Sequence, residues 1–244
     1  MIAIKINNLR KEYKDIVAVD DLNLEINEGE LFSLLGVNGA GKTTTIKMLS
    51  TLTKPTSGDA FIYDYSINKD EDKIKELIDI SMQETAVARK LTVEENIEFY
   101  AKLSGQEKEE IEETKKYIYS SFGLDKVKNK KSSKLSGGWQ RKLSIALALV
   151  TKPKILFLDE PTLGLDVIAR RELWNTIKDL KSHMTIILTT HYMEEAEALS
   201  DRIGIMREGR LLFVGTKEEL YSKTNKDNIE DAFIEIVSGG DINE

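Results

Sequence analysis

Segment 36–43, Gly-Val-Asn-Gly-Ala-Gly-Lys-Thr, constrains the fold of this chain more than any other stretch. It follows the apolar run 31–35, which predicts a short buried strand, and it precedes residues 44–49, which predict a helix. The pattern G-x-x-x-x-G-K-T between a strand and a helix is typical of a phosphate-binding loop. Its glycines let backbone amides approach a polyphosphate closely, and the positive end of the helix dipole attracts the anion. We therefore predict that the chain binds a nucleoside triphosphate.

The side chains of this loop have distinct predicted roles. Lys42 supplies a positive charge to the β- and γ-phosphates, and the Thr43 hydroxyl can ligate Mg²⁺. Upstream, Tyr13 lies in the predicted connection between the first two strands, where it is either a packing aromatic or a platform for stacking a purine. The residues predicted to contact the nucleotide in the loop are Asn38, Gly39, Ala40, Gly41, Lys42, Thr43 and Thr44.

Composition narrows the class of protein. The 244 residues suffice for one large domain, or for one domain with an inserted subdomain. There are 35 Lys and Arg residues against 42 Asp and Glu, and this net charge of −7 gives no support for nucleic-acid binding. The absence of cysteine excludes disulfides and thiolate metal sites. No apolar run approaches the roughly 18 residues that span a bilayer, so we expect a soluble chain unless a partner holds it at a membrane.

The order of strand and helix signals predicts an α/β core with a helical insertion. Apolar residues alternate along the first thirty residues and predict half-buried strands that pair antiparallel. Strand signals then vanish from about residue 84 to residue 133, and Thr92-Val93-Glu94-Glu95 predicts a capping box that opens a helix. Further strands are predicted at residues 60–63, 78–82 and 185–190, a surface helix at 70–78, and a closing hairpin at 204–214.

A second candidate anion site is the Leu-Ser-Gly-Gly segment 135–138, which precedes an apolar-rich helix predicted over residues 139–150. Ser136 is a good N-cap, and Gly137 and Gly138 leave amides free at the helix N-terminus. Ser-Gly-Gly is common turn chemistry, so the segment alone is weak evidence. One nucleotide cannot easily use both anion sites of one subunit, so the pair of sites suggests a nucleotide sandwiched between two subunits.

Acidic residues follow a predicted buried strand at 155–158. Asp159 lies where α/β sheets bind ligands, and its carboxylate can hold Mg²⁺ opposite Thr43. Glu160 would then sit near the γ-phosphate and could polarise a water molecule for in-line attack; the alternative is an acidic turn before proline. His191, at the end of another predicted strand, could donate a hydrogen bond to a γ-phosphate.

Together these segments resemble the nucleotide-binding subunit of an ATP-binding cassette (ABC) transporter over nearly the whole chain. The phosphate-binding loop is similar to Walker A, and residues 135–138 are similar to the LSGG signature, which separates this family from other P-loop ATPases. Asp159 and Glu160 resemble the end of Walker B and the catalytic glutamate. The resemblance also implies an A-loop aromatic, a Q-loop glutamine, a D-loop aspartate and a catalytic switch histidine, at Tyr13, Gln83, Asp166 and His191.

The resemblance implies an ATPase that uses ATP and Mg²⁺. It implies a homodimer or heterodimer in which signature residues 136–138 of one subunit close the ATP of the other, with Asp166 at the interface. Closing and reopening of this dimer would act on an integral membrane permease subunit at the cytoplasmic face of the cell membrane. The resemblance implies no nucleic-acid partner. The implied Mg²⁺ ligands are Thr43, Gln83 and Asp159, and Gln83 is also an implied catalytic residue.

The family fold implied by the resemblance is α/β, with a P-loop NTPase (RecA-like) core. This core has a mainly parallel sheet, an antiparallel β subdomain at the N-terminus and an inserted helical subdomain. We expect an ATPase domain over residues 1–216, followed by a short helical tail at 217–244. Within it we expect the core at 1–83 and 152–216, and the helical subdomain with the signature at 84–151.

Two positions depart from the family pattern, and neither removes a residue named above. Trp139 stands where the signature often has Gln, and Val167 stands where many members have Pro after the D-loop aspartate. The switch region 190–197 resembles that of bacterial and archaeal exporters of drugs, sodium and polysaccharide. The segment 228–235 is similar to the ending of the drug-exporter branch; the alternative is a solvated amphipathic helix. We therefore expect an exporter rather than an importer.

Two other functions stay open at this point. A soluble ABC ATPase of the translation type usually carries two cassettes, and one of the DNA-repair type carries long coiled coils or zinc modules; neither feature is found in this sequence. A binding module that has lost hydrolysis is the second alternative, and the presence of Asp159, Glu160 and His191 argues against it.

Overall fold

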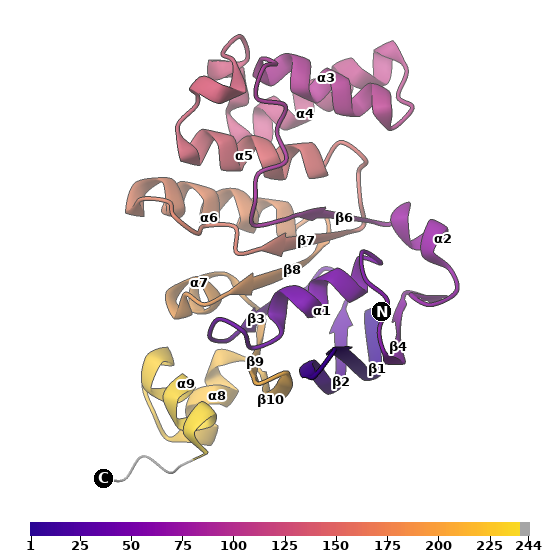
Figure 1. Cartoon of the computed structure of the whole chain (residues 1–244). Coiled ribbons are helices and arrows are strands. Elements are labelled where there is room, and N and C mark those ends of the chain that lie inside the picture. Colours follow the sequence, from indigo (N-terminus) through magenta and orange to yellow (C-terminus); the bar gives the residue numbers. More distant parts are fainter. Residues whose placement is uncertain (240–244) are drawn as a thin grey trace.

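The computed structural model describes residues 1–239 and contains two β-sheets surrounded by helices (Figure 1). The larger sheet has six strands in the order β10-β9-β3-β8-β7-β6. All neighbouring pairs in it are parallel except β9 and β10, which form the predicted closing hairpin, so the sheet is mainly parallel as expected. Its strands are β3 (Leu31–Leu35), β6 (Ile78–Ser81), β7 (Ile155–Asp159), β8 (Thr185–Thr190), β9 (Arg202–Arg207) and β10 (Arg210–Gly215).

The three central strands of this sheet are buried along their whole length. Alternate side chains of a strand point to opposite faces, and each face here has its own core. Leu156 and Leu158 of β7 pack in a cluster with residues of α5 (Gly137–Ala148) and α6 (Val167–Lys181). Ile155 and Phe157 of the same strand pack in a cluster with the smaller sheet and α1 (Lys42–Leu49). An apolar sequence without period-2 alternation is therefore what this position requires.

The smaller sheet is antiparallel and has the strand order β2-β1-β4-β5. It confirms the predicted antiparallel pairing of the N-terminal strands. Tyr13 is the last residue of β1 rather than part of the connection, because the hairpin turn is tighter than predicted. The strands of this sheet are β1 (Ile2–Tyr13), β2 (Ile16–Asn27), β4 (Ser57–Ile62) and β5 (Tyr65–Ser66).

Helices α3 (Val93–Leu103), α4 (Lys108–Phe122) and α5 (Gly137–Ala148) lie between β6 and β7 in the chain and form one end of the molecule in Figure 1. The predicted capping box is present: the Thr92 hydroxyl accepts from the Glu95 amide, and the Glu95 carboxylate accepts from the Thr92 amide. Two short 3₁₀ helices, Leu124–Val127 and Ser132–Lys134, connect α4 to α5.

Three helix predictions need correction. Helix α5 begins at Gly137, two residues earlier than predicted, because the glycines themselves take helical geometry. Ser136 occupies the N-cap position, but its side chain makes no capping hydrogen bond. The helix predicted at 70–78 is shorter, α2 (Glu71–Lys75), because β6 takes up the chain from Ile78.

The remaining helices are α6 (Val167–Lys181), α7 (Met193–Leu199), α8 (Lys217–Thr224) and α9 (Ile229–Ser238). The last two fall in the predicted tail, whose residues 240–244 lie outside the described residues. Apolar side chains of α8 and α9, such as Leu220 and Phe233, share a core cluster with β9. No helix among residues 1–239 is long and apolar enough to cross a membrane.

Candidate active site

The phosphate-binding loop joins β3 to α1 at the carboxyl edge of the larger sheet. Gly41, the residue before α1, has a φ of 103°, a conformation that residues with a Cβ rarely adopt. A Cβ at Gly41 would also lie only 2.5 Å from the Ala18 carbonyl oxygen of β2. The glycine that precedes the lysine is therefore required by both the backbone angle and the close approach of β2. The result is a helix N-terminus whose amides are open to an anion.

Lys42, the first residue of α1, has a side chain that folds back under the loop. Its ammonium donates to the carbonyl oxygens of Gly36 and Val37, at 2.7 and 3.1 Å, and lies 3.7 Å from a Glu160 carboxylate oxygen. The side chain is 4% exposed, and this burial lowers the pKa of Lys42, while the carboxylates of Glu160 and Asp159 oppose the shift. The loop thus places one buried cation at its centre.

Thr43 of α1 and Asp159 at the end of β7 come together, although β8 lies between β3 and β7 in the sheet. The Thr43 hydroxyl lies 3.0 and 3.1 Å from the two carboxylate oxygens of Asp159, whose side chain is almost completely buried. The Thr189 hydroxyl of β8 donates to the same carboxylate at 2.5 Å. Hydroxyl and carboxylate oxygens are the donors that Mg²⁺ prefers, and Mg²⁺ sites are commonly completed by substrate phosphates and water. The pair therefore fits a nucleotide-bound magnesium ion. Among residues 1–239, no cluster of three or more His, Cys, Asp and Glu side chains forms an all-protein metal site.

Glu160 directly follows β7 and is held from two sides. One carboxylate oxygen lies 3.1 Å from Nδ1 of His191, and the other faces Lys42. Its φ is 45°, a left-handed conformation that costs a residue with a side chain roughly 1–3 kcal/mol. The Glu160 amide donates to the carbonyl and to the hydroxyl of Thr189, each at 3.1 Å. Glu160 is thus a strained residue in a fixed position, as at many reaction centres.

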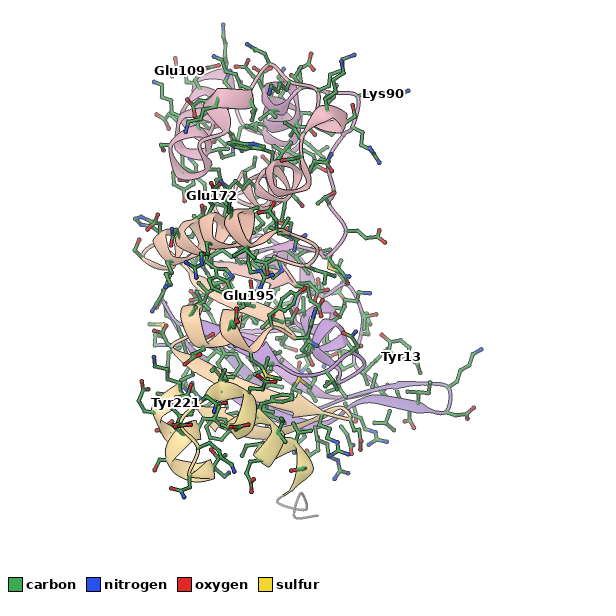
Figure 2. The ribbon with its side chains drawn as sticks, turned by 90° about the vertical axis from the view of Figure 1, so that its left-hand side faces the viewer. Tyr13, Lys90, Glu109, Glu172, Glu195 and Tyr221 are labelled. Atoms are coloured by element: carbon green, nitrogen blue, oxygen red, sulfur yellow. The ribbon has the colours of Figure 1, made fainter. Side chains whose placement is uncertain are left out.

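Lys42, Thr43 and Glu160 line a cavity of about 760 Å³. The cavity brings together Tyr13, Gln83, Glu160 and His191 with the predicted loop residues 38–44. Tyr13 is 44% exposed and lies near the tip of the β1–β2 hairpin, which projects from the side of the molecule (Figure 2). Such an aromatic at the rim can stack on a flat ring. Ile16, Val17, Ala18, Leu163 and Glu208 also line the cavity, and the sequence offered no signal for them.

Five predicted site residues do not line this cavity. Asp159 is buried and contacts the lining residue Thr43. The other four are Ser136, Gly137, Gly138 and Asp166. Ser136 and Gly137 are exposed at the N-terminus of α5, and a Cβ at Gly137 would meet no atom within 4 Å. Asp166 caps α6, because its carboxylate accepts from the amides of Ile168 and Ala169, each at 2.9 Å. In one chain the two anion sites are therefore separate.

Two buried residues at the site carried no motif. Thr189 lies inside a strand of apolar pattern, so only its hydroxyl contacts with Asp159 and Glu160 show its importance. Arg141 is 4% exposed within α5 and donates to four backbone carbonyls. The only signal for it in the sequence is a charge within an apolar-rich helix.

A family model described as ABC transporter matches residues 19–163. The human phospholipid-transporting ATPase ABCA3 is 45% identical to the chain over 224 residues, covering 90% of this chain and 13% of that protein. ABC transporter A family member 7 of Dictyostelium discoideum is 43% identical over 220 residues, covering 89% of this chain and 26% of that protein. The chain thus spans about an eighth and a quarter of the lengths of these relatives.

Solved structures agree with this match. The structure of an ATP binding subunit of an ABC transporter has a TM-score of 0.84 and 25% identity, and covers 96% of this chain and 99% of that chain. A dimeric post-hydrolysis state of an ATP-binding cassette bound to ADP and Pi has a TM-score of 0.78 and 28% identity, and covers 87% of this chain and 98% of that chain. The fold prediction is confirmed, and a soluble ATPase without a transport role is not favoured.

Proposed function

This chain belongs to the ABC transporter family, as an ATPase domain of that family, and from this premise we propose that it binds and hydrolyses ATP to drive a membrane permease. The observation that carries the proposal is the position of Glu160. Its carboxylate lies between the Lys42 ammonium and the His191 ring, at the wall of the cavity that the phosphate-binding loop also lines. A carboxylate beside a polyphosphate site is placed to polarise a water molecule.

The residues of this chain would have the following roles in ATP binding and hydrolysis. The amides of residues 38–44 and the Lys42 ammonium bind the phosphates, and the phosphates take the place of Glu160 beside Lys42. Glu160 then orients and polarises the attacking water, and His191 fixes the carboxylate and faces the γ-phosphate. Thr43 and Asp159, with Gln83, would hold Mg²⁺, which neutralises developing phosphate charge when it is bound.

The proposal includes a head-to-tail pair of nucleotide-binding subunits. Signature residues 136–138 lie apart from the cavity of their own chain, and Ser136 makes no capping hydrogen bond that would engage its hydroxyl. An exposed helix N-terminus with a free hydroxyl suits the γ-phosphate of ATP held by a second subunit. Asp166, which orders the start of α6, would lie at the same interface. The second subunit is either a copy of this chain or a homologue.

The permease and its cargo belong to the same proposal. The named relatives are A family transporters, and one is named as a phospholipid transporter. We therefore place this chain at the cytoplasmic face of a membrane, held there by a permease subunit, with a lipid as the first cargo to test. The switch region 190–197 supports export as the direction, because it resembles that of exporters.

The test uses Glu160→Gln, which keeps the shape of the side chain and removes the base. We expect hydrolysis to fall by about 10³-fold while ATP binding persists, because general-base catalysis supplies rate rather than affinity. Affinity purification of this variant from native membranes with ATP should recover a multi-spanning membrane protein. Normal turnover by the variant would remove Glu160 from its role. Recovery of ribosomes or DNA-repair proteins without a membrane subunit would contradict the transport proposal.

A further inference from the structure

Arg141 lies in the second turn of α5 and points into the core beneath the active site. Its Nε donates to the Pro161 carbonyl at 2.7 Å, and one terminal nitrogen donates to the Asp159 carbonyl at 2.9 Å. The other terminal nitrogen donates to the carbonyls of Met82 and Gln83, at 2.5 and 3.1 Å. One side chain of α5 therefore joins two separate segments of the active-site backbone.

The environment of this guanidinium is unusual for a buried cation. The side chain is 4% exposed, and within residues 1–239 no carboxylate oxygen lies within 4 Å of it. Burial lowers the pKa of Arg141 to about 10, an effect opposed by the charges of Asp159 and Glu195, and the group stays protonated at neutral pH. A buried charge without an ion-pair partner is unfavourable unless its donors are satisfied, and here backbone carbonyls satisfy them. Only the planar fork of arginine can reach all of them at once.

Two of these carbonyls flank the strained residue of the site. The Asp159 carbonyl directly precedes Glu160, whose φ is 45°, and the Pro161 carbonyl lies one peptide group beyond it. Thr189 holds the Glu160 amide from the opposite side. A left-handed conformation persists only where the surrounding contacts over-determine it. Arg141 and Thr189 are the side chains that do so here.

We propose that Arg141 is a positioning residue for ATP hydrolysis: by binding the backbone on both sides of Glu160 and at Gln83, it aims the catalytic carboxylate and ties its position to helix α5. The inference rests on the proposed function, since it requires Glu160 to act in hydrolysis. It gives α5, whose first residues are the signature glycines, a direct connection to the reacting centre. A movement of α5 would change the direction of the Glu160 carboxylate.

The neighbouring residue Lys142 supplies a matched control. It lies on the same helix and carries the same charge, and its ammonium pairs with the Glu172 carboxylate of α6 at 2.8 Å. Glu172 is on α6, near the surface (Figure 2). None of the hydrogen bonds of Lys142 reaches a backbone carbonyl beside Glu160. Lys142→Met therefore removes a cation and an interhelical contact from α5 without removing any of the hydrogen bonds that Arg141 makes.

The experiment measures ATP dissociation constants, kcat and melting temperature for the full chain, with Arg141→Lys, Arg141→Met and Lys142→Met. We expect kcat to fall about 10-fold for Arg141→Lys and about 100-fold for Arg141→Met, because misplacing a catalytic group by about 1 Å costs a rate of this order. ATP affinity should change less than about 3-fold, because the phosphate-binding loop keeps its contacts. Lys142→Met should keep kcat within about 2-fold.

A second measurement separates positioning from general support of the fold. Arg141→Lys is added to Glu160→Gln, and single-turnover hydrolysis is compared with that of Glu160→Gln alone. We expect no further loss beyond about 2-fold, because residues that act through one group are not additive. Losses that multiply, or a wild-type kcat in Arg141→Met, would overturn the inference. If Arg141→Met does not fold, Arg141→Lys gives the decision. A wild-type chain that hydrolyses no ATP under any condition would instead overturn the proposed function, and this inference with it.

Discussion

Two helix N-termini of this molecule are rich in glycine, and they differ in what surrounds them. The N-terminus of α1 is enclosed: Lys42 folds beneath it, Asp159 and Glu160 lie beside it, and Tyr13 stands at the rim. The N-terminus of α5 is open, and a Cβ added at Gly137 would meet no atom of residues 1–239 within 4 Å. The proposed function accounts for this difference: one half of the nucleotide site would be built within the chain, and the other half would be offered to a second subunit.

This contrast predicts that nucleotide binding and hydrolysis depend on different regions. Binding requires the enclosed N-terminus, which already has its charge and its closely approaching amides. In the proposed head-to-tail pair, hydrolysis requires the open N-terminus of another subunit as well. Changes to α1 should therefore reduce ATP affinity, whereas changes to the start of α5 should reduce turnover and subunit association.

Lys42→Ala gives the largest expected effect on binding. We expect ATP affinity to fall about 100-fold, because the loop loses a buried, charge-assisted contact to the phosphates. Isothermal titration with ATP and Mg²⁺ measures this change. An unchanged dissociation constant would contradict the assignment of the enclosed N-terminus as the phosphate site.

Gly137→Ala tests the open N-terminus with little disturbance of the chain itself. The added methyl group has no neighbour within 4 Å, and alanine is a better helix former than glycine, so the melting temperature should stay equal or rise. We expect hydrolysis and ATP-dependent dimerisation to fall about 10-fold, because the methyl group occupies space that the partner's phosphate would need. ATP affinity of the single chain should not change.

A mixing experiment is the control for this prediction. In a head-to-tail homodimer, Lys42→Ala and Gly137→Ala chains together form one site that contains neither substitution. Hydrolysis by the mixture should therefore exceed that of either variant alone. Activity of the mixture equal to the mean of the two would show that each chain works by itself, and the contrast between the two N-termini would then have no functional meaning.

Tyr13 defines the edge of the enclosed half. Tyr13→Ala should weaken ATP binding by roughly 2- to 10-fold, and Tyr13→Phe should not, because stacking needs the ring and not the hydroxyl. Nucleotide titration of both variants measures the effect. Equal affinities would return Tyr13 to the role of a packing aromatic.

Glu195 gives the smallest expected effect and concerns the link between α6 and α7. Its Oε1 accepts from the Trp174 indole at 2.9 Å, while Oε2 has no hydrogen-bond partner within the described structure. Burial raises the pKa of Glu195, so the folded chain holds the proton more tightly than the unfolded chain does. Wild-type stability therefore falls as pH rises above about 4.5, towards the folded pKa.

Glu195→Gln removes this titration. The variant should gain stability relative to wild type as pH rises from 4.5, with melting temperature moving by roughly 2–4 °C per kcal/mol in a domain of this size. Thermal unfolding at several pH values, followed through the fluorescence of Trp139 and Trp174, measures the difference. Parallel curves for the two proteins would show that the carboxyl does not titrate in this range.

Much of the enclosed half could be predicted from sequence, because its chemistry depends on local spacing. Glycines and a lysine at fixed intervals between a strand and a helix can be recognised without tertiary structure, as can the Thr92 capping box. Arg141 and Thr189 could not be recognised, because their partners are backbone groups distant in the chain. The order of residue types in a sequence does not predict which backbone carbonyl a buried side-chain donor will bind.

The sequence also predicted helix boundaries and caps poorly. Serine is a common N-cap residue, but the Ser136 side chain makes no capping hydrogen bond, because the backbone of Gly137 and Gly138 takes helical geometry without it. Propensity describes which hydrogen bonds a residue type can make locally. Whether a bond forms depends on the backbone conformation that the surrounding structure imposes.

The sheet order also fixes when the nucleotide site can exist during synthesis of the chain. Within the described structure, β3 pairs with β8 and β9. Leu35, at the end of β3, therefore cannot pair until Thr190 and Ile205 have been synthesised. The ribosome adds the 170 residues between positions 35 and 205 in roughly 10 to 30 s at typical rates. The β1–β2 hairpin needs no later segment and can form at once. For that interval the nascent chain carries a complete phosphate-binding sequence without the larger sheet that supports it, and ATP can act as a folding ligand only after Ile205 emerges.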